Sequence, residues 1–173
     1  MQEYIEKETF KEGLWEFVEH VGEYLNPPEK IRPSARAIIV KDNKILLSCE
    51  TRNNVYMSPG GGLEEGETLE ECCCRELQEE TGYIVKPIKL FAVVNEYSFE
   101  TLYINNYFIC EIAGECNRNL TENEIYQRVE PKWVEIPRAV EIFGEYESKP
   151  QDQKSLYFRE YTIINKYLNL LNI

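Results

Sequence analysis

The stretch GGGLEEGETLEECCCRELQEETG, residues 60–82, carries both a turn signal and a complete helix signal. Thr68 followed by Glu71 forms a capping box, so Thr68 is expected to cap a helix that runs to Thr81. Gly82 is the residue type that most readily adopts the left-handed conformation at a helix end. Because both ends are marked, the sequence predicts a glycine-rich loop followed by a helix of defined length.

Projected at about 100° per residue, this helix has an apolar stripe that should face the rest of the protein. The stripe is formed by Leu69, Cys72, Cys73 and Leu77. Glu76 and Glu80 fall inside it, and Glu79 lies at its border. Carboxylates at these spacings repel one another, and inward-facing charges lose solvation. A divalent cation resolves both problems, and carboxylate oxygens without His or thiolate suit Mg²⁺, with Mn²⁺ as a substitute.

The alternative interpretation of these glutamates is a solvated helix face, because E-x-x-E-E is a common pattern on exposed helices. The inward phase of the three side chains favours the metal site instead. The glycine run immediately upstream favours it further, since the backbone groups of Gly61 and Gly62 can approach phosphates and metal closely.

From Gly61 to Tyr83 the sequence resembles a complete Nudix box, as in MutT-type pyrophosphohydrolases. Every fixed position is filled. The nearest imperfection is Tyr83, where an aliphatic residue is usual and an aromatic residue is a mild change. The resemblance implies an α/β fold, an α/β/α sandwich with a mixed sheet in which the box forms loop, helix and loop. It also implies cleavage of a nucleoside diphosphate linked to another moiety, by water attacking phosphorus in a Mg²⁺-dependent step.

The resemblance assigns roles to individual residues. The metal-binding glutamates of the family are matched by Glu76, Glu79 and Glu80. The backbone carbonyl of Gly61 is similar to one that ligates metal, and Glu67 matches a glutamate that supports the loop.

Two further roles concern catalysis. Arg75 matches an arginine that orients the box carboxylates, and its spacing lets it reach Glu79 or Glu71. The general base varies in the family, and the sequence leaves two candidates open, Glu76 and Glu124.

Substrate contacts are expected from residues on or after strands that lead to the glycine loop. Arg36 and Arg52 are placed to meet phosphates, with surface ion pairing as the alternative. A stacking face for a base is offered by Tyr97, Phe99, Tyr103 and Tyr107, for which core packing is the alternative.

Composition narrows the class of protein. At 173 residues a single domain is the default. A net charge of −12 argues against a nucleic-acid polymer as partner and leaves a small anionic ligand held through a metal. No apolar run is long enough for a membrane span, and the acidic start shows no signal peptide, so a cytoplasmic protein with no membrane partner is expected. The six cysteines are interpreted as small apolar fillers.

The remaining chain is expected to mix strands and helices. Thr9 to Glu12 reads as a second capping box, followed at helical spacing by Phe10, Leu14, Phe17, Val18, Val21 and Leu25. This predicts an N-terminal amphipathic helix within an extension, residues 1–30, packed on a hydrolase domain of residues 31–173, with a homodimer contact as the alternative role. Strands are predicted over 36–40, 44–50, 84–99, 102–112 and 132–136, a polar loop over 115–130, and helices after Pro137 and over 156–171.

The leading interpretation is a pyrophosphohydrolase acting on a small nucleoside diphosphate derivative, such as a nucleotide sugar, ADP-ribose or a modified nucleoside triphosphate. The alternative in another class is a non-catalytic nucleotide-binding regulatory module on the same scaffold. An enzyme acting on capped or 5′-triphosphorylated RNA is disfavoured by the negative charge but stays open.

Overall fold

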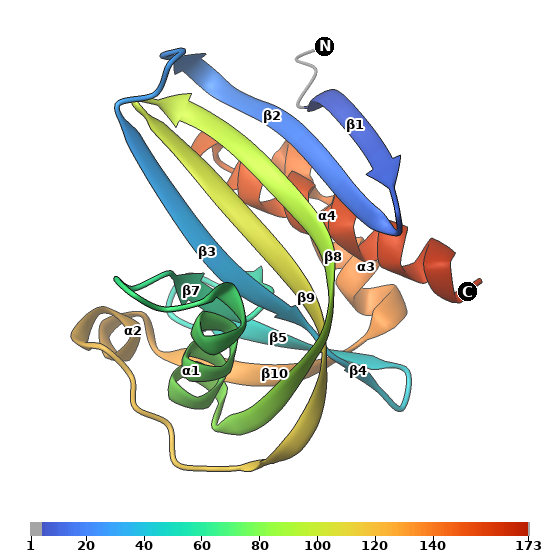
Figure 1. The fold of residues 1–173 in the computed structure, drawn as a ribbon. Coiled ribbons are helices and arrows are strands. Elements are labelled where there is room, and N and C mark those ends of the chain that lie inside the picture. The colour runs from blue at the N-terminus through green and yellow to red at the C-terminus, as the bar shows by residue number, and fades with distance from the viewer. Residues whose placement is uncertain (1–4, 173) are drawn as a thin grey trace.

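The computed structural model describes residues 5–172. A long mixed sheet runs through the molecule (Figure 1). Across the sheet the strands are β1 (Ile5–Lys11), β2 (Leu14–Tyr24), β8 (Tyr83–Phe99), β9 (Thr101–Glu115), β3 (Lys30–Ile38) and β7 (Gly60–Gly62). β2 is parallel to β8 and β3 is parallel to β9, whereas the other neighbours are antiparallel. The prediction of a mixed sheet is therefore confirmed.

A second, antiparallel sheet consists of β10 (Val129–Glu135), β5 (Lys44–Glu50) and β4 (Val40–Lys41), with β6 (Val55–Met57) paired to β5. Asp42 and Asn43 join β4 to β5 with φ of 50° and 59°. Both values are left-handed, which is the conformation that a two-residue hairpin turn needs. The two residues thus form the turn of a β-hairpin, which joins the strands predicted over 36–40 and 44–50.

Helices cover both faces of the long sheet (Figure 1). α1 (Leu69–Thr81) lies on one face, where Cys72, Cys73 and Leu77 pack against Ala35, Ala37 and Phe108. α3 (Ile136–Gly144) and α4 (Gln151–Leu171) lie on the other, with the short turn η1 (Tyr146–Ser148) between them. This second core includes Phe17, Ile38, Leu47, Phe143 and Ile163. Two cores on opposite faces give the predicted α/β/α arrangement.

The predicted N-terminal helix is wrong. Its residues form the antiparallel strands β1 and β2, joined by Glu12 and Gly13 with φ of 53° and 79°. The segment forms a strand because β8 offers an edge with unpaired backbone groups. β2 pairs with this edge in parallel from Trp15 onward, so the backbone groups of both strands are hydrogen-bonded. The Glu12-Gly13 pair was the overlooked signal, since a glycine-containing pair between apolar runs favours a hairpin.

The predicted polar loop over 115–130 is also wrong in part. It contains α2 (Glu122–Gln127), which begins at a capping box formed by Thr121 and Glu124. The Thr-x-x-Glu spacing marked this helix in the sequence.

Two expectations from composition can be checked directly. All six thiols are free, and the interpretation as apolar fillers is confirmed for four buried cysteines, Cys49, Cys72, Cys73 and Cys110. It is wrong for Cys116, which is exposed. Among residues 5–172, none of the helices combines the length and the apolar character that a membrane crossing requires.

Candidate active site

The glycine run is pressed between β3 and α1. As β7 it pairs with β3, with Gly60 opposite Arg36 and Gly61 opposite Ala35. A Cβ on Gly60 would lie 2.1 Å from the backbone oxygen of Ala35, and a Cβ on Gly61 would lie 2.4–2.5 Å from the carboxyl atoms of Glu76. Glycine is therefore needed at both positions, at Gly60 for the backbone and at Gly61 for the carboxylate of α1.

The helix α1 has the predicted caps. The Thr68 hydroxyl accepts from the backbone N–H of Glu71, and the Glu71 carboxylate accepts from the N–H of Thr68 at 2.8 Å. Gly82 has φ of 77° and donates to the Gln78 carbonyl at 3.1 Å. Since both ends are fixed, the phase of the glutamates between them is fixed as well.

Glu80 is the most buried of the three predicted ligands, at 6% exposure. Its carboxylate accepts a hydrogen bond of 2.9 Å from the backbone N–H of Gly60. Burial raises the pKa of Glu80 to about 7, although the Gly60 hydrogen bond and the charge of Arg36 act in the opposite direction. This carboxylate therefore lies beneath the glycine run, as the inward phase predicted.

Glu76 and Glu79 share one arginine. Nη1 of Arg75 lies 2.8 Å from Oε1 of Glu76 and 3.3 Å from Oε2 of Glu79. Burial raises the pKa of Glu76 despite this pairing, and the negative charges of Glu79 and Glu124 raise it further. Of the two partners that spacing allowed for Arg75, the structure has Glu79, because Glu71 is engaged in the helix cap.

Arg75 also ties α1 to the loop before it. Its Nε donates to Oε1 of Glu67 at 2.8 Å, and its Nη2 donates to the carbonyl of Gly62 at 3.0 Å. The Glu67 carboxylate also accepts from the backbone N–H of Glu64 at 3.1 Å. Arg75 thus holds the loop, Glu76 and Glu79 in one connected network.

The Glu67–Arg75 pair predicts an acid-dependent loss of stability. The Arg75 hydrogen bond lowers the pKa of Glu67 to about 2, against an ordinary value of 4.5. Because the folded-state pKa is lowered, the stabilisation is complete above the unfolded pKa of about 4.5 and is lost as the pH falls toward about 2. In urea unfolding, the free-energy difference between wild type and Glu67→Gln should stay constant above about pH 5 and shrink below it.

Glu70→Gln is the control for that series, since Glu70 is exposed on the same helix. Its difference from wild type should vary much less over the same pH range. A Glu67→Gln difference that did not change down to about pH 3.5 would contradict the assigned pairing.

Three carboxylates and a backbone carbonyl make a donor set of hard oxygen ligands, which fits Mg²⁺ or Mn²⁺. As they stand, no three Asp, Glu, His or Cys side chains within residues 5–172 are gathered closely enough to hold an ion. The Arg75 guanidinium bridges Glu76 and Glu79, so the positive charge between them is that of the arginine. The chemistry of the donors fits a hard cation, and Glu76 and Glu79 would have to turn from Arg75 to meet it.

The three remaining predicted residues are Arg36, Glu124 and Arg52. Arg36 lies close enough to Glu80 for its charge to lower the pKa of that carboxylate. Its guanidinium donates to the carbonyl of Ser58 at 3.0 Å and to Oδ1 of Asn105 at 3.3 Å. Glu124 lies close enough for its charge to raise the pKa of Glu76 and Glu80. Arg52 is exposed, and its guanidinium stacks on the Tyr126 ring at 4.0 Å.

The four aromatic residues proposed as a stacking face lie in different environments. Tyr107 is fully buried, and its hydroxyl donates to Glu160 at 2.8 Å, so core packing is its role. Tyr97 packs against His20 and Tyr24. Phe99 and Tyr103 are exposed.

Sequence reasoning missed several polar residues near the glycine run. They are Ser34, Ser58, Asn105 and Glu160. Asn105 accepts from Ser34 and Arg36 through Oδ1, while its buried Nδ2 has no partner within the described structure. None of these residues belongs to a local motif, because tertiary contacts alone bring them together.

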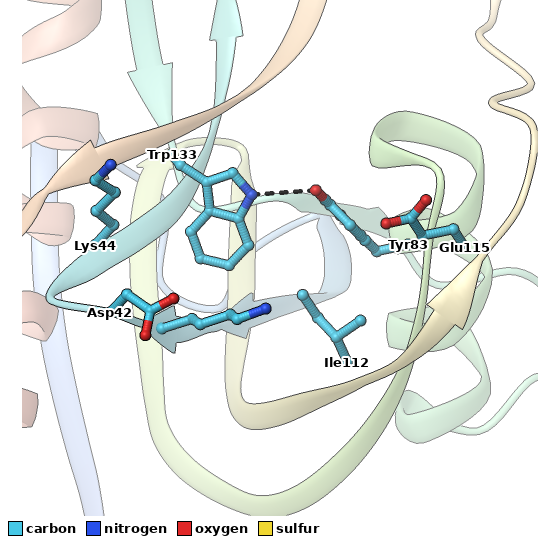
Figure 2. A pocket seen from close by; sticks show the side chains of 7 residues that line it. Asp42, Lys44, Tyr83, Ile112, Glu115 and Trp133 are labelled. Carbon is cyan, nitrogen blue, oxygen red and sulfur yellow. Dashed lines mark hydrogen bonds between the residues drawn. The ribbon is translucent and has the colours of Figure 1, made fainter.

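A separate hollow of about 320 Å³ lies elsewhere on the surface, between the β4–β5 turn, β10 and the ends of β8 and β9 (Figure 2). Here the indole N–H of Trp133 donates to the hydroxyl of Tyr83 at 3.1 Å, which gives this tyrosine a partner at the position where the box usually has an aliphatic residue. None of the predicted site residues lines this hollow.

Comparison with known proteins supports the geometric picture. A NUDIX domain model matches residues 30–157. An ADP-ribose pyrophosphatase of Methanocaldococcus jannaschii is 45% identical over 97 residues, covering 53% of this chain and 54% of that protein. The NAD-capped RNA hydrolase NudC of Vibrio parahaemolyticus is 37% identical over 95 residues, covering 54% of this chain and 36% of that protein. The chain thus spans about half or less of the length of these curated relatives.

Among solved structures, a NUDIX hydrolase from Nitrosomonas europaea aligns with a TM-score of 0.55 and 23% identity. The alignment covers 76% of this chain and 88% of that one. At this identity the likeness concerns the fold.

Proposed function

This chain belongs to the NUDIX domain family, and from that membership we propose that it is a metal-dependent pyrophosphohydrolase acting on a nucleoside diphosphate derivative. One observation carries the proposal: the glycine strand β7 lies against Glu76 and Glu80, with Arg75 connecting the same loop to Glu79. Such an arrangement places carboxylate oxygens and backbone groups together where a phosphate and a cation could be bound.

The substrate class follows from charge and from the relatives. Their names point to ADP-ribose and to NAD-capped RNA as substrates of those proteins. With a net charge of −12, this chain favours a small molecule over a nucleic-acid polymer. Nucleotide sugars, ADP-ribose and nucleoside triphosphates are the substrates we propose, with Arg36 and Arg52 binding their phosphates.

In this proposal Glu76, Glu79, Glu80 and the carbonyl of Gly61 would hold Mg²⁺, with Mn²⁺ as a substitute. The ion would supply charge neutralisation for the phosphates and acidify bound water. Arg75 orients the carboxylates through its hydrogen bonds to Glu76 and Glu79. The backbone of Gly62 and that of Gly61 approach the phosphates.

The general base is proposed to be Glu76 or Glu124. Thr121 fixes the Glu124 carboxylate by donating to it from its backbone N–H at 2.7 Å and its hydroxyl at 2.8 Å. Full kcat in a Glu124→Gln variant would assign the role to Glu76.

The proposal also covers the domain boundaries, the cellular location and the oligomeric state of the enzyme. We place the hydrolase domain at residues 31–173 with residues 1–30 as an extension, in a cytoplasmic protein with no membrane partner. A homodimer is part of the same proposal, and light scattering on the purified chain tests it.

The activity itself is tested with a panel of nucleoside diphosphate derivatives. In the presence of Mg²⁺ we expect release of a nucleoside monophosphate, and EDTA should abolish that release. Nucleotide binding without turnover across the panel would contradict the proposal and favour a regulatory module. Turnover that survives EDTA would contradict the role of the metal.

A further inference from the structure

A chain of buried polar groups connects α4 to the segment just before the glycine strand. Glu160 on α4 is fully buried, and both of its carboxylate oxygens are bonded. Oε2 accepts from the Ser58 hydroxyl at 2.6 Å, and Oε1 accepts from the Tyr107 hydroxyl at 2.8 Å. Tyr107 in turn accepts from Nε of Arg159 at 2.8 Å, whose Nη1 donates to Glu96 at 3.1 Å.

Residues 58–60 are fixed one by one to different parts of the fold. The Ser58 carbonyl accepts from Arg36, and the Pro59 carbonyl accepts from the N–H of Ala37 at 2.9 Å. The Gly60 N–H donates to Glu80 at 2.9 Å. Ser58 is thus the link between Glu160 on α4 and the backbone that holds Glu80.

A carboxylate in the interior is costly unless its oxygens are satisfied, so its hydrogen bonds define the position of the groups that donate them. Glu160 lies beyond residues 30–157, the region that the family model matches. Its bond to Ser58 is therefore a feature that the shared family region does not include.

We propose that Glu160 is a positioning residue, which through the Ser58 hydroxyl holds the Gly60 amide in place to orient the Glu80 carboxylate. The inference rests on the proposed function, because it takes Glu80 as a metal-binding group. It assigns Glu160 no contact with the substrate. Glu160 acts by holding the Glu80 carboxylate in its orientation before metal or substrate binds.

Ser58→Ala and Glu160→Gln test the proposal in the full chain. Loss of a group that orients a metal ligand typically lowers metal affinity or activity by about 10- to 100-fold, and we expect this in both variants. Mn²⁺ affinity is measured without substrate by electron paramagnetic resonance, and kcat is measured with the best substrate of the panel. Ser58→Ala makes no substitution within α4, so it tests the same link if Glu160→Gln does not fold.

Glu96→Gln is the matched control. It removes a buried carboxylate of the same network that bonds Arg159 but does not contact residues 58–60. We expect it to lower the melting temperature while Mn²⁺ affinity and kcat stay within about twofold of wild type.

The outcomes separate the inference from the proposed function. If wild type binds Mn²⁺ and turns over substrate but Ser58→Ala does so equally well, the positioning role is overturned and the hydrolase stands. The role is also overturned if Glu96→Gln weakens Mn²⁺ binding as much as Ser58→Ala, because the effect would then be general instability. A wild type that neither binds Mn²⁺ nor hydrolyses the panel overturns both.

Discussion

Glu79→Gln is expected to lower kcat by about 10²-fold or more, because a metal-held charge contributes several kcal/mol to the transition state and each 1.36 kcal/mol is tenfold in rate. The melting temperature should stay close to that of wild type. Glu79 has a side-chain exposure of 32%, and its pairing with Arg75 is an i,i+4 contact of a kind that contributes about 0.3–0.5 kcal/mol. The substitution also removes a negative charge that raises the pKa of Glu76. The two stability effects oppose each other.

Steady-state hydrolysis and thermal unfolding of the same preparation check this expectation. Glu70→Gln is the control, since it makes the same chemical change on the exposed side of α1. It should retain full activity. If the Glu79→Gln protein hydrolysed substrate at the wild-type rate, the assignment of Glu79 to the active site would be contradicted.

The helix α1 could be predicted in full because its signals are local. The Thr68 capping box and the left-handed Gly82 fix its two ends, and the spacing of Glu76 and Glu80 within the apolar stripe fixes which carboxylates turn inward. The limits of this helix and the phase of its carboxylates therefore depend only on residues that are close in sequence. The bridging of Glu76 and Glu79 by Arg75 needed the structure, because spacing alone left Glu71 as an equal partner.

The N-terminal strands show where local reasoning fails. The apolar spacing of β2 fits a helix, yet the segment pairs with β8, which is distant in sequence. A buried Glu19 opposite Glu96 disguises the alternation expected of a strand. Burial and the charge of Glu96 raise the pKa of Glu19 well above its usual range. The polar network of α4 is equally hidden, since Glu160 and Ser58 carry no motif.

Gly61→Ala is expected to retain the fold and lose activity, by about 10²-fold, since a misplacement of about 1 Å at a catalytic group can cost that much. The new Cβ would lie 2.4–2.5 Å from the carboxyl atoms of Glu76, which are the end of a flexible side chain and can move away. The φ angle of Gly61 is not in the left-handed region, so alanine can adopt it. Replacing glycine at such a position stabilises a protein by about 0.4–1 kcal/mol through the unfolded state, which offsets part of the strain.

Activity, circular dichroism and urea unfolding of Gly61→Ala, measured beside two other glycine-to-alanine variants, test this separation of site from fold. Gly114→Ala should be neutral, because its Cβ meets Ile84 at an ordinary 3.5 Å. Gly60→Ala should lose stability, since its Cβ would lie 2.1 Å from the backbone oxygen of Ala35 at φ of 146°, and a paired strand cannot move aside. If Gly61→Ala instead unfolded like Gly60→Ala, the glycine strand would be a structural support alone. If Gly61→Ala kept full activity, hydrolysis would not depend on the position of the Glu76 carboxylate next to Gly61. The assignment of Glu76 to the active site would then be refuted.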